Sequence, residues 1–333
     1  MPEQSPRASL LQLVNGFQVS QAIHVAAVLG IADMLKDGPR TIDDIARNTE
    51  TEPGATYRLM RALAAVGVLL EEAGRVFSLT PVGACLRGDG PGSLRDWAIF
   101  IGHESNWNTW GSLLLGVKSG ENVFPQVHGT SVWKYRADRP ELSAIFDRAT
   151  AVTKSGASIL DIYDFSAFGV IVDVGGGNGL LLASLLSAYP QARGILFDQP
   201  HVASNNELAK VGVADRCEVV GGTFFEEIPA GGDVYILRAV IHDWDDENSV
   251  AILKTCRKAM SNSAKLLLNE RVVGPPNEDA HTKFSDLNML VNPGGRERSE
   301  EEYARLLDAA DLRLSRATAR APDLFSVIEA TPV

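Results

Sequence analysis

The stretch Val170-Ile-Val-Asp-Val-Gly-Gly-Gly-Asn-Gly179 decides the fold of this chain. Four of its first five residues are β-branched, which predicts a strand buried on both faces of a parallel sheet. Glycines then alternate at Gly175, Gly177 and Gly179, and Leu180–Tyr189 has the composition of an apolar helix that ends before Pro190. Glycines let a backbone approach a ligand closely, and a helix N-terminus favours negative charge. The stretch therefore predicts a nucleotide-binding site between a strand and a helix.

An acidic residue follows where a ribose ligand is expected. Asp198 comes nineteen residues after Gly179, at the end of a second predicted strand over Gly194–Phe197. A carboxylate there can accept hydrogen bonds from both hydroxyls of a ribose. The dinucleotide-binding pattern would need a third glycine at position 180, where this chain has leucine. The spacing resembles instead the G-x-G-x-G motif of S-adenosylmethionine-dependent methyltransferases, while a strand-to-helix turn without a ligand is the alternative interpretation.

The composition limits the classes of function. A length of 333 residues suggests two domains, and the net charge of −11 argues against nucleic acid or an anionic membrane as a partner. No apolar run approaches the length of about 18 residues that a membrane span needs, and the N-terminus has no visible signal peptide. The three cysteines are widely separated and have no metal-binding spacing. We therefore expect a reduced, cytoplasmic protein.

The first part of the chain, residues 1–95, has the pattern of a small helical domain. Leu10–Leu35 has apolar residues on more than one side of a helix, which a partner chain could bury. Two shorter helices and a hairpin follow and resemble a winged helix-turn-helix; they are expected over Thr41–Arg47, over Gly54–Val66, and over Val68–Leu70 with Val76–Leu79. Residues 41–86 contain six acidic and four basic residues, although a DNA reader needs a basic face. The pattern therefore favours a structural or dimerising module over a DNA-binding regulator.

The rest of the chain contains an aromatic helical segment followed by repeated strand and helix units. Residues 96–165 are rich in large rings, most of which should be core, while a minority can line a cavity for a flat ligand. After Asp198 we expect strands over Cys217–Val220, Asp233–Leu237, Ala264–Asn269, Leu312–Ala317 and Leu324–Ala330, with helices over Asp243–Met260 and Ser299–Ala310. This alternation predicts a parallel, doubly wound α/β sheet.

Ligands of such sheets bind at the carboxyl ends of the strands, and three chemically useful side chains are expected there. His242 follows the strand Asp233–Leu237, Glu270 ends the next strand, and Glu297 lies in a loop before a helix. A histidine held by carboxylates is a plausible general base. An alternative is a metal ion on Asp243, Asp245 and Asp246, but acids this close together at a helix start point in different directions. We expect no metal site.

Four motifs together resemble one family, the metal-independent small-molecule O-methyltransferases that include the plant caffeate and isoflavone enzymes, acetylserotonin methyltransferase and bacterial antibiotic-tailoring enzymes. They are Asp173-Val-Gly-Gly-Gly-Asn-Gly179, Phe197-Asp-Gln-Pro200, Leu237-Arg-Ala-Val-Ile-His-Asp-Trp-Asp-Asp246 and Asn292-Pro-Gly-Gly-Arg-Glu-Arg298. The resemblance covers essentially the whole chain. It implies a class I S-adenosylmethionine methyltransferase fold, which is a Rossmann-like doubly wound sheet, with an N-terminal α-helical winged-helix dimerisation domain. The implied domains are residues 1–95 for dimerisation, 96–165 as a helical substrate-chamber linker, and 166–333 for methyl transfer.

The resemblance also implies roles for individual residues. It makes His242 the base, flanked by Glu270 and Glu297. It assigns the cofactor S-adenosyl-L-methionine, which leaves as S-adenosyl-L-homocysteine, to Gly175, Gly177, Asp198, Gly222, Thr223, Phe224 and Arg238. Thr223 departs from the family, which usually has aspartate there and so offers the adenine a charged acceptor. We expect the substrate to contact His103, Trp107, Phe146, Met289 and Asn292.

These implications combine into one expected activity. The chain should be a homodimer that methylates a hydroxyl of an aromatic small molecule, a secondary metabolite, without a metal. N- or C-methylation, or a non-methylating tailoring step on the same cofactor fold, are the alternative reactions.

Overall fold

The computed structural model describes residues 5–90, 92–153, 157–204, 206–318 and 325–333. The contacts between Cα atoms separate two compact units. Unit 1 contains Met1–Asn108 and Arg139–Val152, and unit 2 contains Thr109–Asp138 and Thr153–Val333. The predicted linker of residues 96–165 is therefore shared between the two units, and its separate status stays a prediction. Within the described residues no helix is long and apolar enough to cross a bilayer.

Unit 1 is mainly helical and contains one small sheet. Its elements are α1 (Pro6–Val14), α2 (Gly16–Val28), α3 (Ile31–Met34), β1 (Arg40–Thr41), α4 (Ile42–Thr49), α5 (Pro53–Ala65), β2 (Leu69–Glu72), β3 (Val76–Leu79), α6 (Pro81–Ala84), α7 (Arg95–Gly102), most of α8 (Glu104–Gly111) and most of α12 (Pro140–Thr153). The helices α4 and α5 and the sheet β1-β3-β2 have the predicted winged-helix arrangement, with β1 as a strand that was not expected. Ile45, Met60, Leu63 and Phe77 form its fully buried core.

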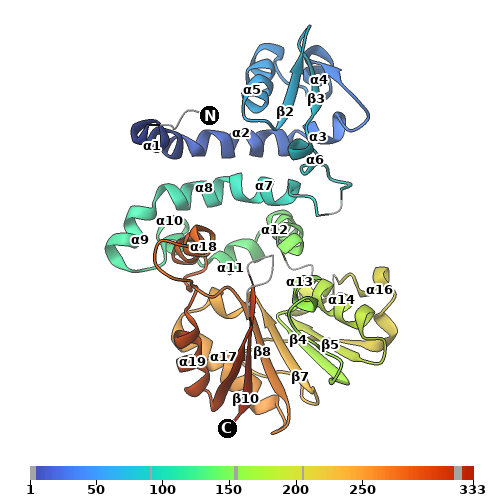
Figure 1. Cartoon of the computed structure of the whole chain (residues 1–333), viewed down its shortest axis with the longest axis vertical. Coiled ribbons are helices and arrows are strands. Elements are labelled where there is room, and N and C mark those ends of the chain that lie inside the picture. The colour runs from blue at the N-terminus through green and yellow to red at the C-terminus, as the bar shows by residue number, and fades with distance from the viewer. Residues whose placement is uncertain (1–4, 91, 154–156, 205, 319–324) are drawn as a thin grey trace. The chain divides into compact units, whose positions relative to one another are not determined.

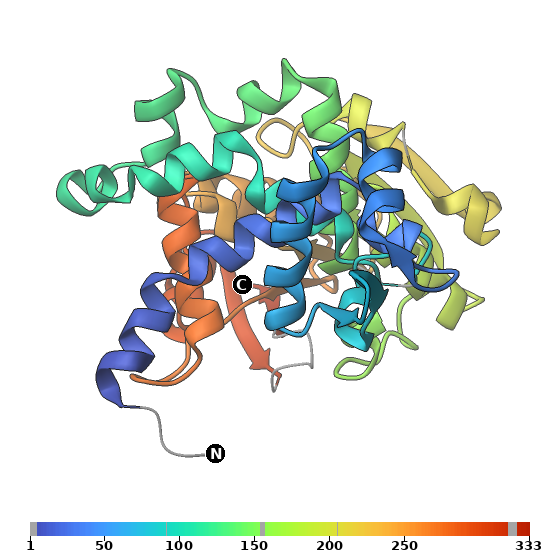
Figure 2. The same cartoon turned by 90° about the horizontal axis from the view of Figure 1, so that it is seen from above.

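The prediction of one helix over Leu10–Leu35 is wrong. The helix is interrupted at Asn15 and again at Gly30, whose φ of 65° lies in the left-handed region that glycine adopts without strain. Figure 2 shows α1 and α2 as successive helices with a change of direction between them. Several apolar side chains of these two helices are exposed in the single chain: Leu10, Leu11, Leu13, Val14 and Phe17.

Unit 2 contains the large sheet. Its strands are β4 (Val170–Val174), β5 (Arg193–Asp198), β6 (Cys217–Gly221), β7 (Val234–Arg238), β8 (Lys265–Glu270), β9 (Leu312–Ala317) and β10 (Ser326–Pro332). Its helices are α9 (Leu113–Ser119), α10 (Val123–His128), α11 (Val132–Ala137), α13 (Ala157–Leu160), α14 (Leu180–Ala188), α15 (Pro200–Ala203), α16 (Leu208–Val211), α17 (Asp246–Ala259), α18 (Ala280–Val291) and α19 (Glu300–Asp308), with short 3-10 turns η1 (Ala214–Arg216) and η2 (Ile241–Asp243).

The strand order β6-β5-β4-β7-β8-β10-β9 is that of a doubly wound sheet with a reversed end. The first five strands are parallel, as predicted, whereas β10 pairs antiparallel with both β8 and β9. The predicted doubly wound sheet is therefore confirmed in β4, β5, β6, β7 and β8, and β9 and β10 add an antiparallel end to it.

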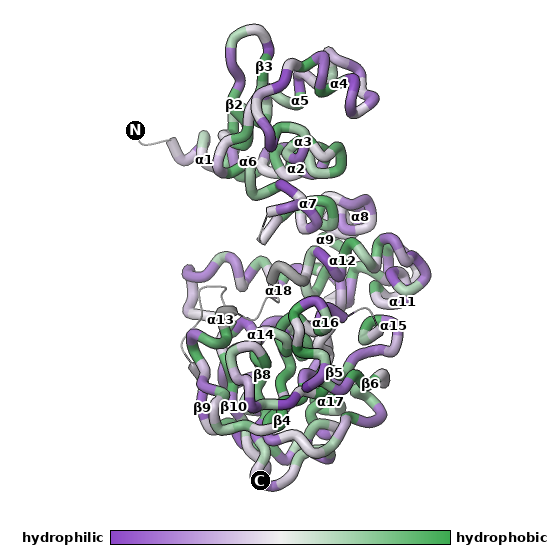
Figure 3. The backbone as a smooth tube through the Cα atoms, turned by 90° about the vertical axis from the view of Figure 1, so that its right-hand side faces the viewer, coloured by the Kyte–Doolittle hydropathy of each residue, from purple (hydrophilic) through white to green (hydrophobic). Residues whose placement is uncertain are grey.

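Helices cover both faces of this sheet, so its strands are apolar on both sides. Along β7, Tyr235 and Leu237 pack with α17 and α19, while Val234 and Ile236 pack with α13 and α14. Figure 1 shows these two helical layers on opposite sides of the strands, and Figure 3 shows hydrophobic stretches gathered on the strands inside the unit. Because β4, β5, β6, β7 and β8 are parallel, the loops that follow them meet at one edge of the sheet.

Candidate active site

The glycine loop after β4 is shaped by backbone angles that side chains disfavour. Gly175 and Gly177 have φ values of 70° and 60°. A Cβ atom on Gly175 would lie 2.9 Å from the Val240 side chain, so this position needs glycine to let the loop after β7 approach. A Cβ on Gly177 would meet nothing within 4 Å, so the loop is open there. The loop is therefore closely packed at Gly175 and has open space beside Gly177.

Asp198 ends β5 beside this loop. One carboxylate oxygen accepts the Gly177 N–H at 2.8 Å, and the other accepts the Gln199 N–H at 2.6 Å. A carboxylate has about four acceptor positions, so each oxygen keeps capacity for one further donor. The side chain is partly buried, and its placement fits a ligand with two adjacent hydroxyls.

The loop after β6 supplies the other predicted cofactor contacts. A Cβ on Gly222 would lie 2.7 Å from the Phe197 ring, which explains the glycine. The Thr223 hydroxyl accepts the Phe225 N–H at 3.4 Å, and the Phe224 ring lies 3.8 Å from a Cβ placed on Gly175. The loop after β6 therefore borders the glycine loop, as the cofactor prediction requires.

Two tryptophans extend this wall, and sequence reasoning assigned neither of them a role. The Trp133 and Trp244 rings stack with centroids 6.0 Å apart, and both Phe224 and Phe225 meet Trp244 edge-on. The indole Nε1 of Trp133 is buried without a hydrogen-bond partner. The only available signal was the position of Trp244, two residues after the predicted base.

Arg238 ends β7 and is almost fully buried. Its guanidinium donates to Asn269 Oδ1 at 2.6 Å and lies over the Phe325 ring at 4.7 Å from the centroid. Asn269 in turn donates to the Ser326 carbonyl, which fixes the end of β10 against β8. Arg238, which is predicted to contact the cofactor, therefore also helps to hold β10 against β8.

The turn that carries His242 is fixed by Glu270. After β7, Ala239 adopts a φ of 51°, a conformation that costs a non-glycine residue energy and often marks functional turns. It directs the N–H groups of Val240 and Ile241 at Glu270 Oε1, at 3.0 and 2.8 Å. The other oxygen of Glu270 is buried without a hydrogen bond and lies 3.8 Å from His242 Nδ1. Glu270 thus holds both the backbone of the turn and one side of the ring.

Glu297 holds the same ring nitrogen from a loop more than fifty residues away in the sequence. Its Oε1 lies 3.1 Å from His242 Nδ1 and accepts the Ser285 hydroxyl at 2.7 Å. Its backbone N–H donates to Asp286 Oδ1 at 2.9 Å. Two residues of α18 therefore set the position of Glu297, and neither was predicted to do so.

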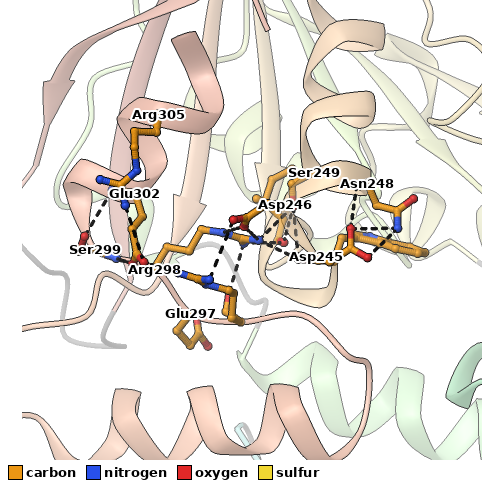
Figure 4. A network of polar contacts seen from close by, with 12 residues as sticks. Asp245, Asp246, Asn248, Ser249, Glu297, Arg298, Ser299, Glu302 and Arg305 are labelled. Atoms are coloured by element: carbon orange, nitrogen blue, oxygen red, sulfur yellow. Dashed lines mark hydrogen bonds and ion pairs between the residues drawn. The ribbon is translucent and has the colours of Figure 1, made fainter. Parts of the chain in front are cut away.

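Arg298 connects the loop that contains Glu297 with the turn that carries His242. Its side chain has no exposed surface and donates to the carbonyls of Ile241 and Trp244, at 3.1 and 2.8 Å, and to Asp246 Oδ1. Figure 4 shows Arg298 between Glu297 and the start of α17, where Asp246 and Ser249 lie beside it. Because Arg298 is the neighbour of Glu297 in the chain, it fixes the carboxylate relative to the turn that carries His242.

The three buried groups have shifted pKa values. Burial alone lowers the pKa of His242, but the charges of Glu297, Asp243 and Glu270 outweigh it and raise that pKa to about 9. Burial raises the pKa of Glu270, with His242 opposing the shift. Burial also works to raise the pKa of Glu297, but His242, Ser285 and Arg271 outweigh it and keep that carboxyl below its usual range. The two shifts have opposite directions, so the cluster favours a proton on His242 over one on Glu297.

His242, Glu270 and Glu297 also have the spacing of metal ligands, since one ligand atom from each lies within 4.8 Å of the others. Glu297 Oε1, however, already binds the histidine and Ser285 and lies 3.7 Å from the guanidinium of Arg271. A fixed positive charge this close disfavours a second cation. The donors around Glu297 thus favour a proton-binding cluster.

The acids considered as an alternative metal site do not converge. Asp245 caps α17 by accepting the Asn248 N–H at 2.8 Å, and Asp246 pairs with Arg298. Asp243 lies instead beside His242 Nε2, at 3.6 Å. The predicted helix start at Asp243 is wrong, because Ile241–Asp243 is a 3-10 turn and α17 begins only at Asp246.

The predicted substrate residues fall in both units. In unit 1, His103 Nδ1 accepts the Ser105 N–H at 3.2 Å, Trp107 contacts Phe17, and Phe146 contacts Phe100. In unit 2, Met289 is buried on α18, and Asn292 caps that helix with its Oδ1 buried and without a partner. Their contact with a substrate stays a prediction.

Comparisons with known proteins match two parts of the chain to family models. Residues 110–313 match the model of an O-methyltransferase domain, and residues 11–89 match that of an O-methyltransferase dimerisation domain. The phenazine O-methyltransferase PhzM of Lysobacter antibioticus is 43% identical to this chain over 97% of the chain and 96% of PhzM. The 8-amino-8-demethylriboflavin N,N-dimethyltransferase of Streptomyces davaonensis is 33% identical over 98% of the chain and 96% of that protein.

One similar structure was solved with bound ligands. The O-methyltransferase NcsB1 from neocarzinostatin biosynthesis, in complex with S-adenosylmethionine and 2-hydroxy-5-methyl naphthoic acid, has a TM-score of 0.81 and 34% identity. The similarity covers 95% of this chain and 96% of that one.

Proposed function

The chain belongs to the O-methyltransferase family, and from this premise we propose that it methylates a hydroxyl of an aromatic small molecule with His242 as general base. The observation that carries the assignment of the base is the buried contact between His242 Nδ1 and Glu297 Oε1 at 3.1 Å. A ring that donates from Nδ1 to a carboxylate has Nε2 left to take a proton. The substrate class follows the relatives, among which NcsB1 is solved with a hydroxynaphthoic acid.

The residues at the sheet edge fit S-adenosylmethionine as the cofactor. The spare acceptor positions of Asp198 suit the two ribose hydroxyls, and the open side of Gly177 leaves room beside them. Gly222, Thr223 and Phe224 would border the adenine, where a hydroxyl replaces the usual carboxylate as acceptor. Gly175 and Arg238 would lie near the methionine part. When bound, the cofactor supplies a methyl group on a positively charged sulfur.

The residues of the chain then have separate tasks in the reaction. Positioning of the hydroxyl can contribute several kcal/mol, because it replaces an encounter in solution. His242 Nε2 takes the hydroxyl proton as the oxygen attacks, and the imidazolium that forms faces Glu297 and Glu270. A pKa of about 9 places His242 close to a phenol, whose pKa is about 10, so proton transfer is nearly balanced. For the substrate side, we propose contacts to His103, Trp107, Phe146, Met289 and Asn292.

We also propose an oligomeric state and a location for the protein. The match to the dimerisation domain supports a homodimer, and the exposed apolar side chains of α1 and α2 are suited to burial in a partner. We propose a cytoplasmic location, in keeping with three cysteines that all carry free thiols.

The experiment that tests this proposal offers labelled S-adenosylmethionine with a panel of phenols, enols and hydroxyphenazines. The panel should include matched anilines, because one relative is an N,N-dimethyltransferase. We expect label in an O-methyl product, identified by mass spectrometry and NMR, and loss of that product in His242→Gln. Transfer to nitrogen or carbon alone, or consumption of an acceptor without label, would replace O-methylation with one of the alternative reactions.

A further inference from the structure

Arg271 lies next to the proposed acids but has no role in the reaction described so far. It directly follows β8 and Glu270, and its side chain is only 12% exposed. The guanidinium carbon lies 4.4 Å from the centroid of the Phe325 ring, and Nη1 lies 3.7 Å from Glu297 Oε1. The Tyr303 hydroxyl reaches the Arg271 carbonyl at 3.5 Å. A permanent cation is thus held beside the carboxylate that binds His242.

Three parts of the chain contact Glu297 Oε1, and the carboxyls of Glu270 and Asp286 and the Tyr303 hydroxyl also interact with Glu297 electrostatically. The turn η2 supplies His242, helix α18 supplies the Ser285 hydroxyl, and the end of β8 supplies Arg271. All three meet the same oxygen, Oε1. His242 itself faces Glu297 and Glu270 at Nδ1 and Asp243 at Nε2.

The Phe325 ring explains why the cation stays in place. Arginine presents a flat, weakly hydrated guanidinium that stacks on rings and does not lose its charge at any ordinary pH. The same ring carries Arg238, 4.7 Å from its centroid. Phe325 therefore serves two buried arginines, one at the proposed cofactor site and one at the proposed base.

We propose that Arg271 is a positioning residue of the methyl transfer: its guanidinium, stacked on Phe325, keeps Glu297 ionised and oriented toward His242 Nδ1. The proposal rests on the proposed function, because it assumes that His242 is the base. Arg271 acts on both partners of the His242–Glu297 pair. It fixes the carboxylate that orients the ring, and its positive charge disfavours the imidazolium, so the base is neutral over a wider range of pH.

The test compares Arg271→Met with Arg271→Lys. Without the cation, the imidazolium loses a repelling charge, so the pKa of His242 should rise further, by about one unit. The midpoint of the kcat/KM profile should move up equally, with a roughly tenfold loss at neutral pH that is recovered at high pH. Lysine keeps the charge but not the flat contact with Phe325, so its midpoint should stay near wild type while the plateau kcat falls.

The matched control is Arg75→Met. Arg75 also lies over an aromatic ring, that of Tyr57 at 4.6 Å, but it directly precedes β3 of the small sheet and is not among the residues proposed for the site. It should leave the profile unchanged. Thermal melting and calorimetry with S-adenosylmethionine identify the variants that fold. Phe325→Leu removes the ring from the contact between Arg271 and Phe325 and keeps the arginine.

NMR titration of the His242 ring in the cofactor-free enzyme separates this inference from the proposed function. An unchanged His242 titration and an unchanged profile midpoint in folded Arg271→Met would overturn the role of Arg271 alone. Retention of full, pH-dependent activity in His242→Gln would overturn the proposed base, whatever Arg271 does.

Discussion

Replacing His242 with glutamine removes the proposed base but keeps a side chain that can donate to Glu297. In the wild type, the imidazolium is held by Glu297 at 3.1 Å and Glu270 at 3.8 Å, and its pKa is raised to about 9. Only the neutral ring accepts a proton, so the rate should rise with pH through this pKa. At pH about 7.5, roughly 3% of the ring is neutral, so kcat/KM should rise about 30-fold to its plateau.

The raised pKa also sets the energy of the proton transfer. Moving a proton from a phenol with a pKa of about 10 to this ring is uphill by roughly 1.4 kcal/mol, against roughly 5 kcal/mol for an ordinary histidine. Glutamine offers no such acceptor, so His242→Gln should lower kcat by about 10²–10⁴. The affinity for S-adenosylmethionine should change little.

The assay is steady-state transfer of labelled methyl groups across pH, with the cofactor affinity measured by calorimetry on the same preparations. The His242→Gln profile should lose the rise through about 9 that the wild type shows. Glu270→Gln should cost less than His242→Gln, because the base remains and only its support is weakened. Near-full kcat of His242→Gln at neutral pH, with a phenol of ordinary pKa, would exclude proton removal by this residue and leave positioning to explain the rate.

Three further predictions concern the cofactor, metal and assembly. Asp198→Ala should weaken S-adenosylmethionine binding by roughly 1.5–3 kcal/mol for each lost bond to the carboxylate; unchanged affinity by calorimetry would remove Asp198 as the ribose ligand. Activity should survive an excess of chelator, because Glu297 Oε1 is already occupied by His242 and Ser285; activity lost to chelator and restored by magnesium would contradict this. Sedimentation at micromolar concentration should show twice the 35.8 kDa chain mass, and a fully active monomer would argue against the dimer.

The parts of the fold that the sequence predicts well are those that local composition determines. The strand Val170–Val174 is found at the predicted residues, because a β-branched run before glycines allows few alternatives. Ser299 and Glu302 form the predicted capping box at the start of α19. The start of α17 was placed too early, because consecutive acids resemble a first helical turn, whereas Asp245 is the residue that caps the helix.

The residues that hold the candidate site in place could not be predicted from local composition. Glu270 could be predicted beside His242 because it ends a neighbouring parallel strand, and Glu297 because its loop resembles a motif of the family. The contribution of Ser285 and Arg271 could not, because it depends on where α18 and Phe325 pack, and nothing in the local spacing encodes that. The left-handed angle at Ala239 was equally hidden, since alanine gives no sign of positive φ.

The antiparallel end of the large sheet constrains the order in which it can assemble. The strand β9 pairs only with β10 among the described strands, and β10 lies between β9 and β8. A ribosome therefore makes β9 before the strand that will be its neighbour exists, and the edge of β8 stays open for the same interval. Unpaired edges favour association between chains. A nascent chain interrupted within β10 would retain the glycine loop and every residue proposed for catalysis, and would still present two open edges to other chains.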